Sequence, residues 1–195
     1  GGLPALAERV PIKQFIDHGD SVEMNSERHG KAWEIYLSVA KGSRRSVLPG
    51  DELSLDGIDF TFITSNGEIT QEALARHGPN AQCALAPPRE ENKTENRRSV
   101  GYLLSMGGFE FLNLGDLTPD LQQELACPEY LLPVVDILQV PHHGNYVAPE
   151  LMAAVDPNVA VLNNGARKGG SPEGFDALGV IPDLLGIWQL HWALD

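Results

Sequence analysis

A short apolar stretch that ends in the tetrapeptide Pro-His-His-Gly (residues 141–144) places the strongest constraint on the fold of this chain. Residues 136–140 have the length and composition of a buried strand. Earlier in the sequence, a second apolar run, 109–114, ends in Gly-Asp at 115–116. Carboxylate oxygen and neutral imidazole nitrogen are the ligands that hydrolytic zinc, manganese and iron centres use. Two strands that carry such groups at their ends therefore predict a metal site.

Three side chains are the candidate metal ligands and catalytic residues: Asp116, His142 and His143. Consecutive residues of an extended strand point to opposite faces, so we expect one imidazole to bind the metal and the other to orient it or to contact substrate. The residues leave open which histidine is the ligand. For Asp116, an ordinary turn or helix N-cap is the alternative interpretation.

Two further polar clusters follow predicted strands. Asp17 and His18 are candidates for a supporting shell around the site, with an ordinary turn as the alternative. Arg167 and Lys168 lie in a glycine-rich loop, which can hold a phosphate or carboxylate group of a substrate. A solvated surface loop is the alternative for this second cluster.

Length and composition indicate one globular domain. The chain has 195 residues, of which 42% are hydrophobic and 21% charged. A net charge of −13, with only 14 basic residues, argues against strong binding to duplex nucleic acid. No apolar run is long enough to predict a membrane-spanning helix. The chain begins with Gly1 and shows no signal peptide, so we expect the natural start to lie elsewhere, and the compartment, cytoplasmic or exported, stays open.

The two cysteines, Cys83 and Cys127, lie far apart and outside any CxxC pattern. A structural zinc knuckle is therefore not expected. Base rates favour two free thiols over a disulfide bond.

The order of predicted elements indicates a layered α/β or α+β domain, because two hairpins precede an alternation of strands and helices. Residues 64–98 are polar and rich in turn formers, and we expect a long surface loop there. Helices are predicted at 3–10, 27–40, 120–126, 149–155 and 175–185, and strands at 12–16, 53–55, 58–63, 99–105, 109–114, 136–140, 159–162 and 187–190.

Several of these motifs together resemble the metallo-β-lactamase superfamily. The most similar branch is the metal-hydrolase domain of the competence DNA-uptake protein (ComEC type) and its stand-alone bacterial relatives. The matching segments, in order, are Asn96-Arg97-Arg98-Ser99, Leu114-Gly115-Asp116-Leu117 and Val140-Pro141-His142-His143-Gly144, followed by the run at 159–162.

The resemblance implies a four-layer αββα sandwich, incomplete at the N-terminus, with the site at one edge between two sheets. It implies two metal ions, zinc before manganese or iron, that activate a water for hydrolysis. Asp116 would be the bridging carboxylate and His142 or His143 the late histidine ligand. Asn96 and Ser99 would lie near the entrance of the site and contact substrate.

This sequence departs from the family pattern in two places. The principal HxHxDH motif is missing, while residues 1–6 are similar to the helix start that follows it in the family. We therefore interpret residues 1–195 as a single domain that is a fragment of a larger one. Second, Gly169-Gly170-Ser171-Pro172 stands where DNA-uptake relatives carry Tyr-Gly-His-Pro, which puts nuclease activity in doubt.

The leading hypothesis is a metal-dependent hydrolase, with a phosphodiester as the first candidate substrate and other small molecules open. Two alternatives are kept: a non-catalytic binding or scaffold member of the fold, and a β-lactam or thioester hydrolase. The sequence does not fix the substrate, the metal or the oligomeric state.

Overall fold

The computed structural model describes residues 2–74 and 78–193. Its centre is a mixed eight-stranded sheet in which seven strands follow the order β10-β9-β8-β7-β6-β4-β3 and β5 pairs with β4. The strands of this sheet are β3 (Glu52–Leu55), β4 (Ile58–Ser65), β5 (Glu68–Ile69), β6 (Gly101–Met106), β7 (Phe109–Asn113), β8 (Ile137–Gln139), β9 (Val159–Leu162) and β10 (Gly186–Gln189).

The antiparallel half of the sheet is built from two hairpins, as the sequence predicts. Strands β3 and β4 turn at Asp56-Gly57, where both residues have positive φ. Strands β6 and β7 turn at Gly107-Gly108, and β4 pairs with β6 through an irregularity between Phe62 and Thr64. The glycines serve these turns because a side chain disfavours positive φ.

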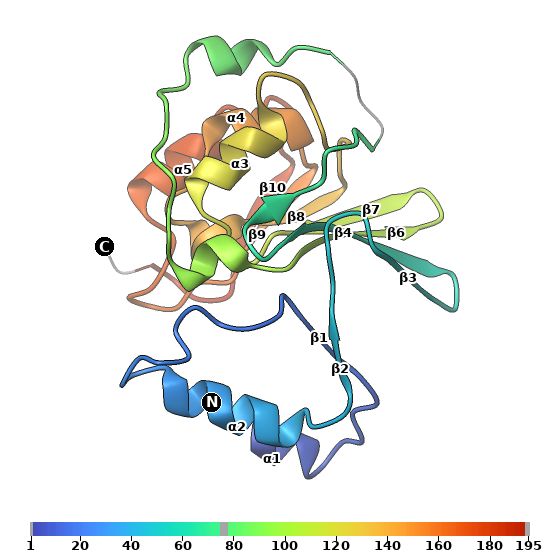
Figure 1. The fold of residues 1–195 in the computed structure, drawn as a ribbon. Coiled ribbons are helices and arrows are strands. Elements are labelled where there is room, and N and C mark those ends of the chain that lie inside the picture. Colours follow the sequence, from blue (N-terminus) through green and yellow to red (C-terminus); the bar gives the residue numbers. More distant parts are fainter. Residues whose placement is uncertain (1, 75–77, 194–195) are drawn as a thin grey trace.

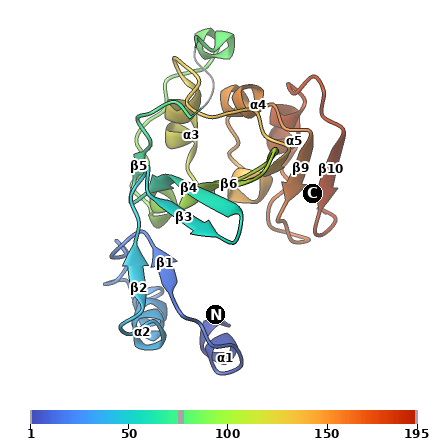
Figure 2. The same cartoon turned by 90° about the vertical axis from the view of Figure 1, so that its right-hand side faces the viewer.

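The parallel half is a repeated strand–helix–strand path from β7 to β10. Because parallel crossovers are right-handed and the strands are added in one direction, the connecting helices fall on the same face of the sheet. Figures 1 and 2 show them together on that face. These helices are α3 (Pro119–Ala126), α4 (Pro149–Val155) and α5 (Pro172–Leu178). Each begins with proline, which is well suited to the first turn of a helix.

The hydrophobic core lies between this sheet face and the three helices. Leu112 of β7, Leu138 of β8 and Leu162 of β9 point toward the helices and are fully buried. They alternate with partly exposed neighbours that point to the opposite side of the sheet. This is the pattern of a strand with one buried face and one partly exposed face.

A smaller N-terminal unit lies on the opposite side of the large sheet (Figures 1 and 2). It consists of the parallel pair β1 (Phe15–Asp17) and β2 (Arg44–Ser46) with the helices α1 (Leu3–Ala7) and α2 (Gly30–Val39). The helices α3, α4 and α5, the large sheet and the N-terminal unit therefore follow one another in that order. The mixed α/β class is confirmed, and within the described residues the second sheet of the expected αββα sandwich has two strands, β1 and β2.

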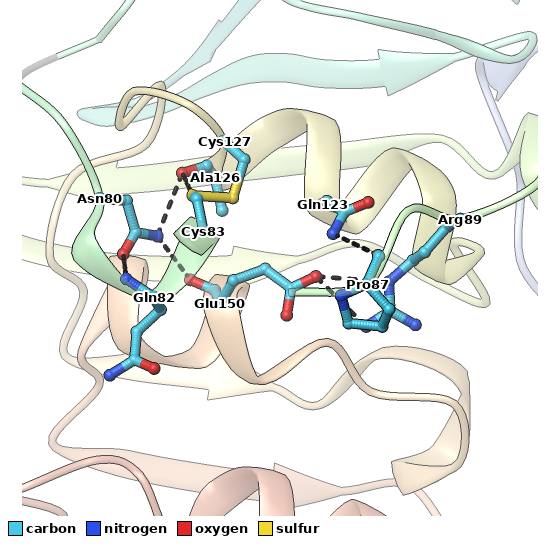
Figure 3. The surroundings of a disulfide bond; sticks show 9 residues. All are labelled: Asn80, Gln82, Cys83, Pro87, Arg89, Gln123, Ala126, Cys127 and Glu150. Carbon is cyan, nitrogen blue, oxygen red and sulfur yellow. Dashed lines mark hydrogen bonds and ion pairs between the residues drawn. A yellow bond between two sulfur atoms is a disulfide. The ribbon is translucent and has the colours of Figure 1, made fainter. Parts of the chain in front are cut away.

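The two cysteines form a disulfide bond, so the expectation of free thiols is wrong. Cys83 lies in the short 3-10 helix η1 (Ala81–Ala84) and Cys127 directly follows α3, with their Cα atoms 5.7 Å apart (Figure 3). The side-chain amide of Asn80 donates to the carbonyls of Ala126 and Glu150 beside the bond. The loop brings together two cysteines that are 44 positions apart in sequence, which spacing alone did not indicate.

The loop predicted at 64–98 is confirmed as mostly irregular from residue 70 to 74 and from 78 onward, with η1 and a second 3-10 helix, η2 (Glu95–Arg98), inside it. Its predicted start is wrong, because β4 extends to Ser65 and β5 follows at Glu68–Ile69, while residues 75–77 lie outside the described residues. Helix α5 begins earlier than predicted, because Ser171 accepts a hydrogen bond from Gly174 N and caps its start. Within residues 2–74 and 78–193, the structure contains no helix with the length and apolar character that crossing a membrane requires.

Candidate active site

The candidate residues gather where the parallel strands end. Asp116 follows β7, the His pair follows β8, and the loop that contains Lys168 follows β9. These three strands are adjacent, with Asn113 opposite Gln139 and Gln139 opposite Val161. The carboxyl edge of parallel strands is a common place for a site because it collects the loops that leave every strand.

Gly115 allows the first two of these loops to meet. It has a φ of +59°, and a Cβ atom there would lie 3.3 Å from the Ser99 side chain. Its carbonyl accepts a hydrogen bond from the backbone N of His142 at 3.0 Å. The glycine therefore joins the loop that contains Asp116 to the loop that contains the histidines.

The two histidines do not continue strand β8, so the argument from alternating strand faces does not apply. They lie in a 3-10 turn, η3 (Pro141–Gly144), with φ of 52° at His142 and 61° at His143. Positive φ at two successive non-glycine residues is costly and is tolerated where surrounding contacts enforce it. Gly169 supplies one such contact, since a Cβ there would come within 2.2 Å of the His143 carbonyl oxygen.

His143 is held between a backbone carbonyl and a carboxylate. Its Nδ1 lies 2.7 Å from the Asn163 carbonyl oxygen, and its Nε2 lies 3.3 Å from Oδ1 of Asp116. A carbonyl only accepts, so Nδ1 donates the proton, and in neutral His143 the Nε2 lone pair faces the carboxylate. The Nε2 lone pair of His143 and the Asp116 carboxylate oxygen are both acceptors. Their contact therefore requires either a proton on Nε2 or a cation between the two atoms.

The separation of those two atoms fits a shared metal ion. Zinc bonds of about 2.0 to 2.2 Å at a tetrahedral angle place two ligand atoms roughly 3.3 Å apart. A donor bond from Nδ1 to a backbone carbonyl is also the usual way in which a ligating histidine is oriented. Among residues 2–74 and 78–193, however, no group of three or more His, Cys, Asp or Glu stands close enough to hold a metal ion. Asp116 and His143 thus supply part of a ligand set.

His142 faces a different environment. Burial lowers the pKa of its imidazole, and the nearby charges of His143 and Lys168 act in the same direction, against an opposing effect of Asp116. The ring Nδ1 is buried and has no hydrogen-bond partner within the described part of the chain. The ring of Tyr146 lies edge-on to it, with centroids 5.2 Å apart.

His142 lines a cavity of about 600 Å3 beside the Asp116–His143 pair. Asn96, a predicted substrate contact, also lines this cavity. Ser99, the second predicted contact, packs against Gly115, and its carbonyl accepts a hydrogen bond from the Thr64 hydroxyl.

Arg167 and Lys168 lie in the loop that follows β9. Arg167 lines a separate cavity of about 210 Å3 near Gly169 and Gly170. Lys168 belongs to a tight bridge with Gly165, and its charge acts on His142. One of the two predicted cations is therefore close to the candidate site.

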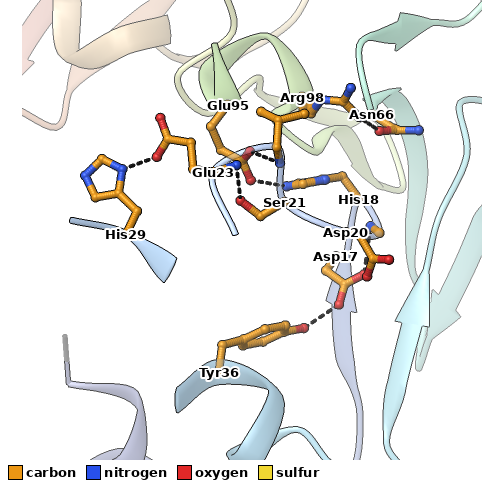
Figure 4. A network of polar contacts seen from close by, with 12 residues as sticks. Asp17, His18, Asp20, Ser21, Glu23, His29, Tyr36, Asn66, Glu95 and Arg98 are labelled. Atoms are coloured by element: carbon orange, nitrogen blue, oxygen red, sulfur yellow. Dashed lines mark hydrogen bonds and ion pairs between the residues drawn. The ribbon is translucent and has the colours of Figure 1, made fainter. Parts of the chain in front are cut away.

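Asp17 and His18 take different places. Asp17 binds Arg44, Tyr36 and Ser46 within the N-terminal unit. Figure 4 shows its contact with Tyr36. His18 pairs through Nε2 with Glu95 at 3.0 Å, next to Asn96 in η2. His18 thus contacts the element that contributes to the cavity, while Arg44, Tyr36 and Ser46, which bind Asp17, lie within its own unit.

The sequence analysis gave no individual role to Asn163, whose backbone carbonyl contacts His143, or to most of the residues that line the cavity, among them Tyr146, Arg89 and Asp120. No motif marks the Tyr146 ring. Arg89 and Asp120 were assigned to a loop and a helix, and only their ion pairs with Glu150 and Arg97 reveal their roles.

No protein-family model matches this sequence, and neither does any curated protein. Among solved structures, a protein described as a metal-dependent hydrolase from Parabacteroides distasonis aligns over 93% of this chain and 65% of its own, at 15% identity with a TM-score of 0.42. The metallo-β-lactamase fold protein YhfI from Bacillus subtilis aligns over 98% and 69%, at 7% identity and a TM-score of 0.44. CmlA, a diiron β-hydroxylase from Streptomyces venezuelae, aligns over 81% and 35%, at 13% identity and a TM-score of 0.42.

This chain therefore spans less than two thirds of the first structure and about a third of CmlA. Such likenesses concern the fold alone, since one fold hosts many functions.

Proposed function

We propose that this chain is part of a metal-dependent hydrolase of the metallo-β-lactamase type, most similar to the competence DNA-uptake branch. The observation that carries the proposal is the Asp116–His143 pair, in which a carboxylate oxygen faces an imidazole nitrogen whose other nitrogen donates to a carbonyl. In such enzymes zinc, manganese or iron, usually as two ions, makes a bound water acidic enough to attack at neutral pH.

In this proposal Asp116 and His143 are ligands, and groups outside the described residues complete the set. His142, whose Nδ1 has no partner in the described structure, faces the substrate cavity and contacts substrate. Lys168 lies in the loop after β9, in a bridge with Gly165, and its charge would favour an anionic substrate, of which a phosphodiester is the class that we propose. Arg167, one residue earlier, would extend that positive surface.

The test is metal analysis of the full-length gene product, purified without chelator. We expect about two equivalents of zinc, manganese or iron per chain, as binuclear hydrolases hold. Asp116→Ala should remove at least one equivalent and abolish hydrolysis of bis(4-nitrophenyl) phosphate. The matched control is His29→Ala, which replaces the exposed histidine at the N-cap of α2. This variant should keep the metal.

A folded full-length protein that holds no metal and takes up none on addition would contradict this proposal and leave a binding module. Metal-loaded protein that hydrolyses nitrocefin or a thioester, and no phosphodiester, would keep the hydrolase and change the substrate class.

A further inference from the structure

The cavity beside His142 has the composition of a pocket for a neutral, hydrogen-bonding group. Its walls come from the long loop at 89–96, from the start of α3 and from the turn after the His pair. The lining residues are Arg89, Glu90, Asn92, Thr94, Asn96, Thr118, Pro119, Asp120, His142 and Tyr146.

The arginines at this cavity are already neutralised. Arg89 places Nε and Nη2 at 3.3 and 3.2 Å from Oε1 of Glu150, whose side chain is 3% exposed. Arg97, behind the wall, donates through Nε to Oδ2 of Asp120 at 2.8 Å. Among the described lining residues, the arginine that a phosphate or carboxylate would meet in this cavity already has an acidic partner. The anion would also meet the negative charge of Glu90.

The polar groups of the wall accept hydrogen bonds. Burial raises the pKa of Asp120, but the Thr118 hydroxyl, Arg97 and the backbone N of Asn92 outweigh it and hold that pKa below its usual value. Oδ1 of Asp120 and the Thr118 hydroxyl have almost no accessible surface and interact with each other, so they do not face the cavity. The carboxylate of Glu90 also lines the cavity, and an ionised carboxylate only accepts, so its partner in a ligand has to donate.

Tyr146 adds an apolar surface at the rim. Its side chain is 67% exposed although it lines the cavity and contacts His142. An aromatic face beside acceptor groups suits a ring that has an apolar face and hydroxyl groups at its edge. Carboxylates recognise sugar hydroxyls in this manner in nucleotide-binding folds.

From this geometry we propose that the cavity binds a sugar, and that the substrate of the adjoining site is a sugar phosphodiester. The sugar lies against Tyr146 and donates hydroxyl hydrogens to the wall that contains Glu90 and Asn96. The phosphodiester lies over the Asp116–His143 pair. The sugar site stands on the cavity alone, while the phosphodiester part rests on the proposed function.

The experiment is amide chemical-shift mapping of the full-length protein, with no metal added, on titration with D-ribose, D-glucose or N-acetyl-D-glucosamine. We expect at least one of them to shift the amides of Asn92, Asn96 and Tyr146, with a Kd of about 1–10 mM for a single ring. Inorganic phosphate and ethylene glycol are the comparison probes and should shift none of these amides.

Variants assign the binding to the cavity. Tyr146→Ala should weaken the sugar at least about fivefold, as loss of one aromatic contact predicts. Trp188→Ala is the matched control, because that aromatic side chain is 68% exposed and does not line the cavity. Asn96→Ala tests the polar wall without breaking the Asp120 ion pair. Circular dichroism checks that each variant is folded.

Binding of phosphate at these amides would overturn the sugar pocket, as would sugar binding that survives both Tyr146→Ala and Asn96→Ala. Absence of binding by all three sugars at 100-fold the concentration of the protein, up to about 50 mM, would overturn it as well. The sugar titration needs no metal, so it tests the pocket separately from the proposed function. Sugar binding together with a failure to take up added metal would reject the proposed hydrolase and keep the pocket.

Discussion

The guanidinium group of Arg89 lies against a single buried oxygen, Oε1 of Glu150, and thereby ties the wall of the cavity to helix α4. The Glu150 side chain is 3% exposed, and Arg89 is the ion-pair partner that compensates for its loss of water contacts. Breaking a buried pair from one side is expensive, because the remaining charge stays in a poorly solvated place.

Arg89→Met should therefore destabilise the protein by about 2–4 kcal/mol, and the double variant Arg89→Met/Glu150→Leu should recover most of that loss. Urea denaturation at pH 7 measures both changes. Glu150→Gln compared with Glu173→Gln separates the ion pair from the helix dipole, because each glutamate follows the first proline of its helix and Glu173 is exposed. Equal losses for the two glutamine variants would contradict the prediction.

Reduction of Cys83–Cys127 should destabilise the folded chain by up to about 4 kcal/mol, the chain-entropy value for a loop of this length. The urea midpoint should fall on addition of dithiothreitol. The Cys83→Ser/Cys127→Ser variant is the control. Its urea midpoint should be low without dithiothreitol and should not change when dithiothreitol is added. An unchanged midpoint in the native sequence would show that the bond contributes little.

Asp17 should make the chain sensitive to acid. Burial raises the pKa of its carboxyl, but hydrogen bonds from Arg44, Tyr36 and Ser46 and from the backbone N of Gly19 bring it down to about 2, from 3.8 in an unfolded chain. A lowered pKa contributes stability above 3.8 that is lost as the pH falls from there to about 2. After allowance for solvent screening we expect about 1–2 kcal/mol.

Asp17→Asn should accordingly lose that amount at pH 7 and match the native protein near pH 2. Thermal unfolding followed across this range measures the difference. Asp183→Asn, a control for which no such network surrounds the carboxyl in the described structure, should show no comparable change. A penalty for Asp17→Asn that is independent of pH would point to lost packing instead.

Gly169→Ala tests how the histidine turn is held. The new Cβ would meet the His143 carbonyl oxygen at 2.2 Å, and φ at this position is +85°. We expect a loss of more than about 2 kcal/mol and a displaced His143. Gly107→Ala is the control, because φ is +62° there and no atom lies within 4 Å, so it carries the strain without the collision. Equal effects on the urea midpoint would assign the cost to backbone strain alone.

His143 should contribute more to metal binding than His142. In the full-length protein, His143→Ala should lower zinc affinity by about tenfold or more, since it removes the nitrogen that faces Asp116. His142→Ala should lower it less and should raise KM for a phosphodiester. Competition with a chromogenic chelator gives the two affinities, and the opposite order would make His142 the ligand.

The local structure follows closely from the sequence. The hairpins turn at their glycines, and helix α4 spans the residues that its apolar spacing predicted, 149–155. Asp116 and the His pair follow adjacent strands, as the order of apolar runs indicates. These features depend on side-chain periodicity and turn chemistry, which neighbouring residues carry.

Tertiary structure alone decided the rest. The disulfide bond and the Arg89–Glu150 pair join positions 44 and 61 residues apart. Placement of the Asn163 carbonyl against Nδ1 of His143 selects which imidazole nitrogen faces Asp116. A sequence specifies which groups are present and which local conformations they favour. Their protonation, pairing and shared cavity depend on contacts between distant segments, and such contacts exist only once the sheet and its helices have packed.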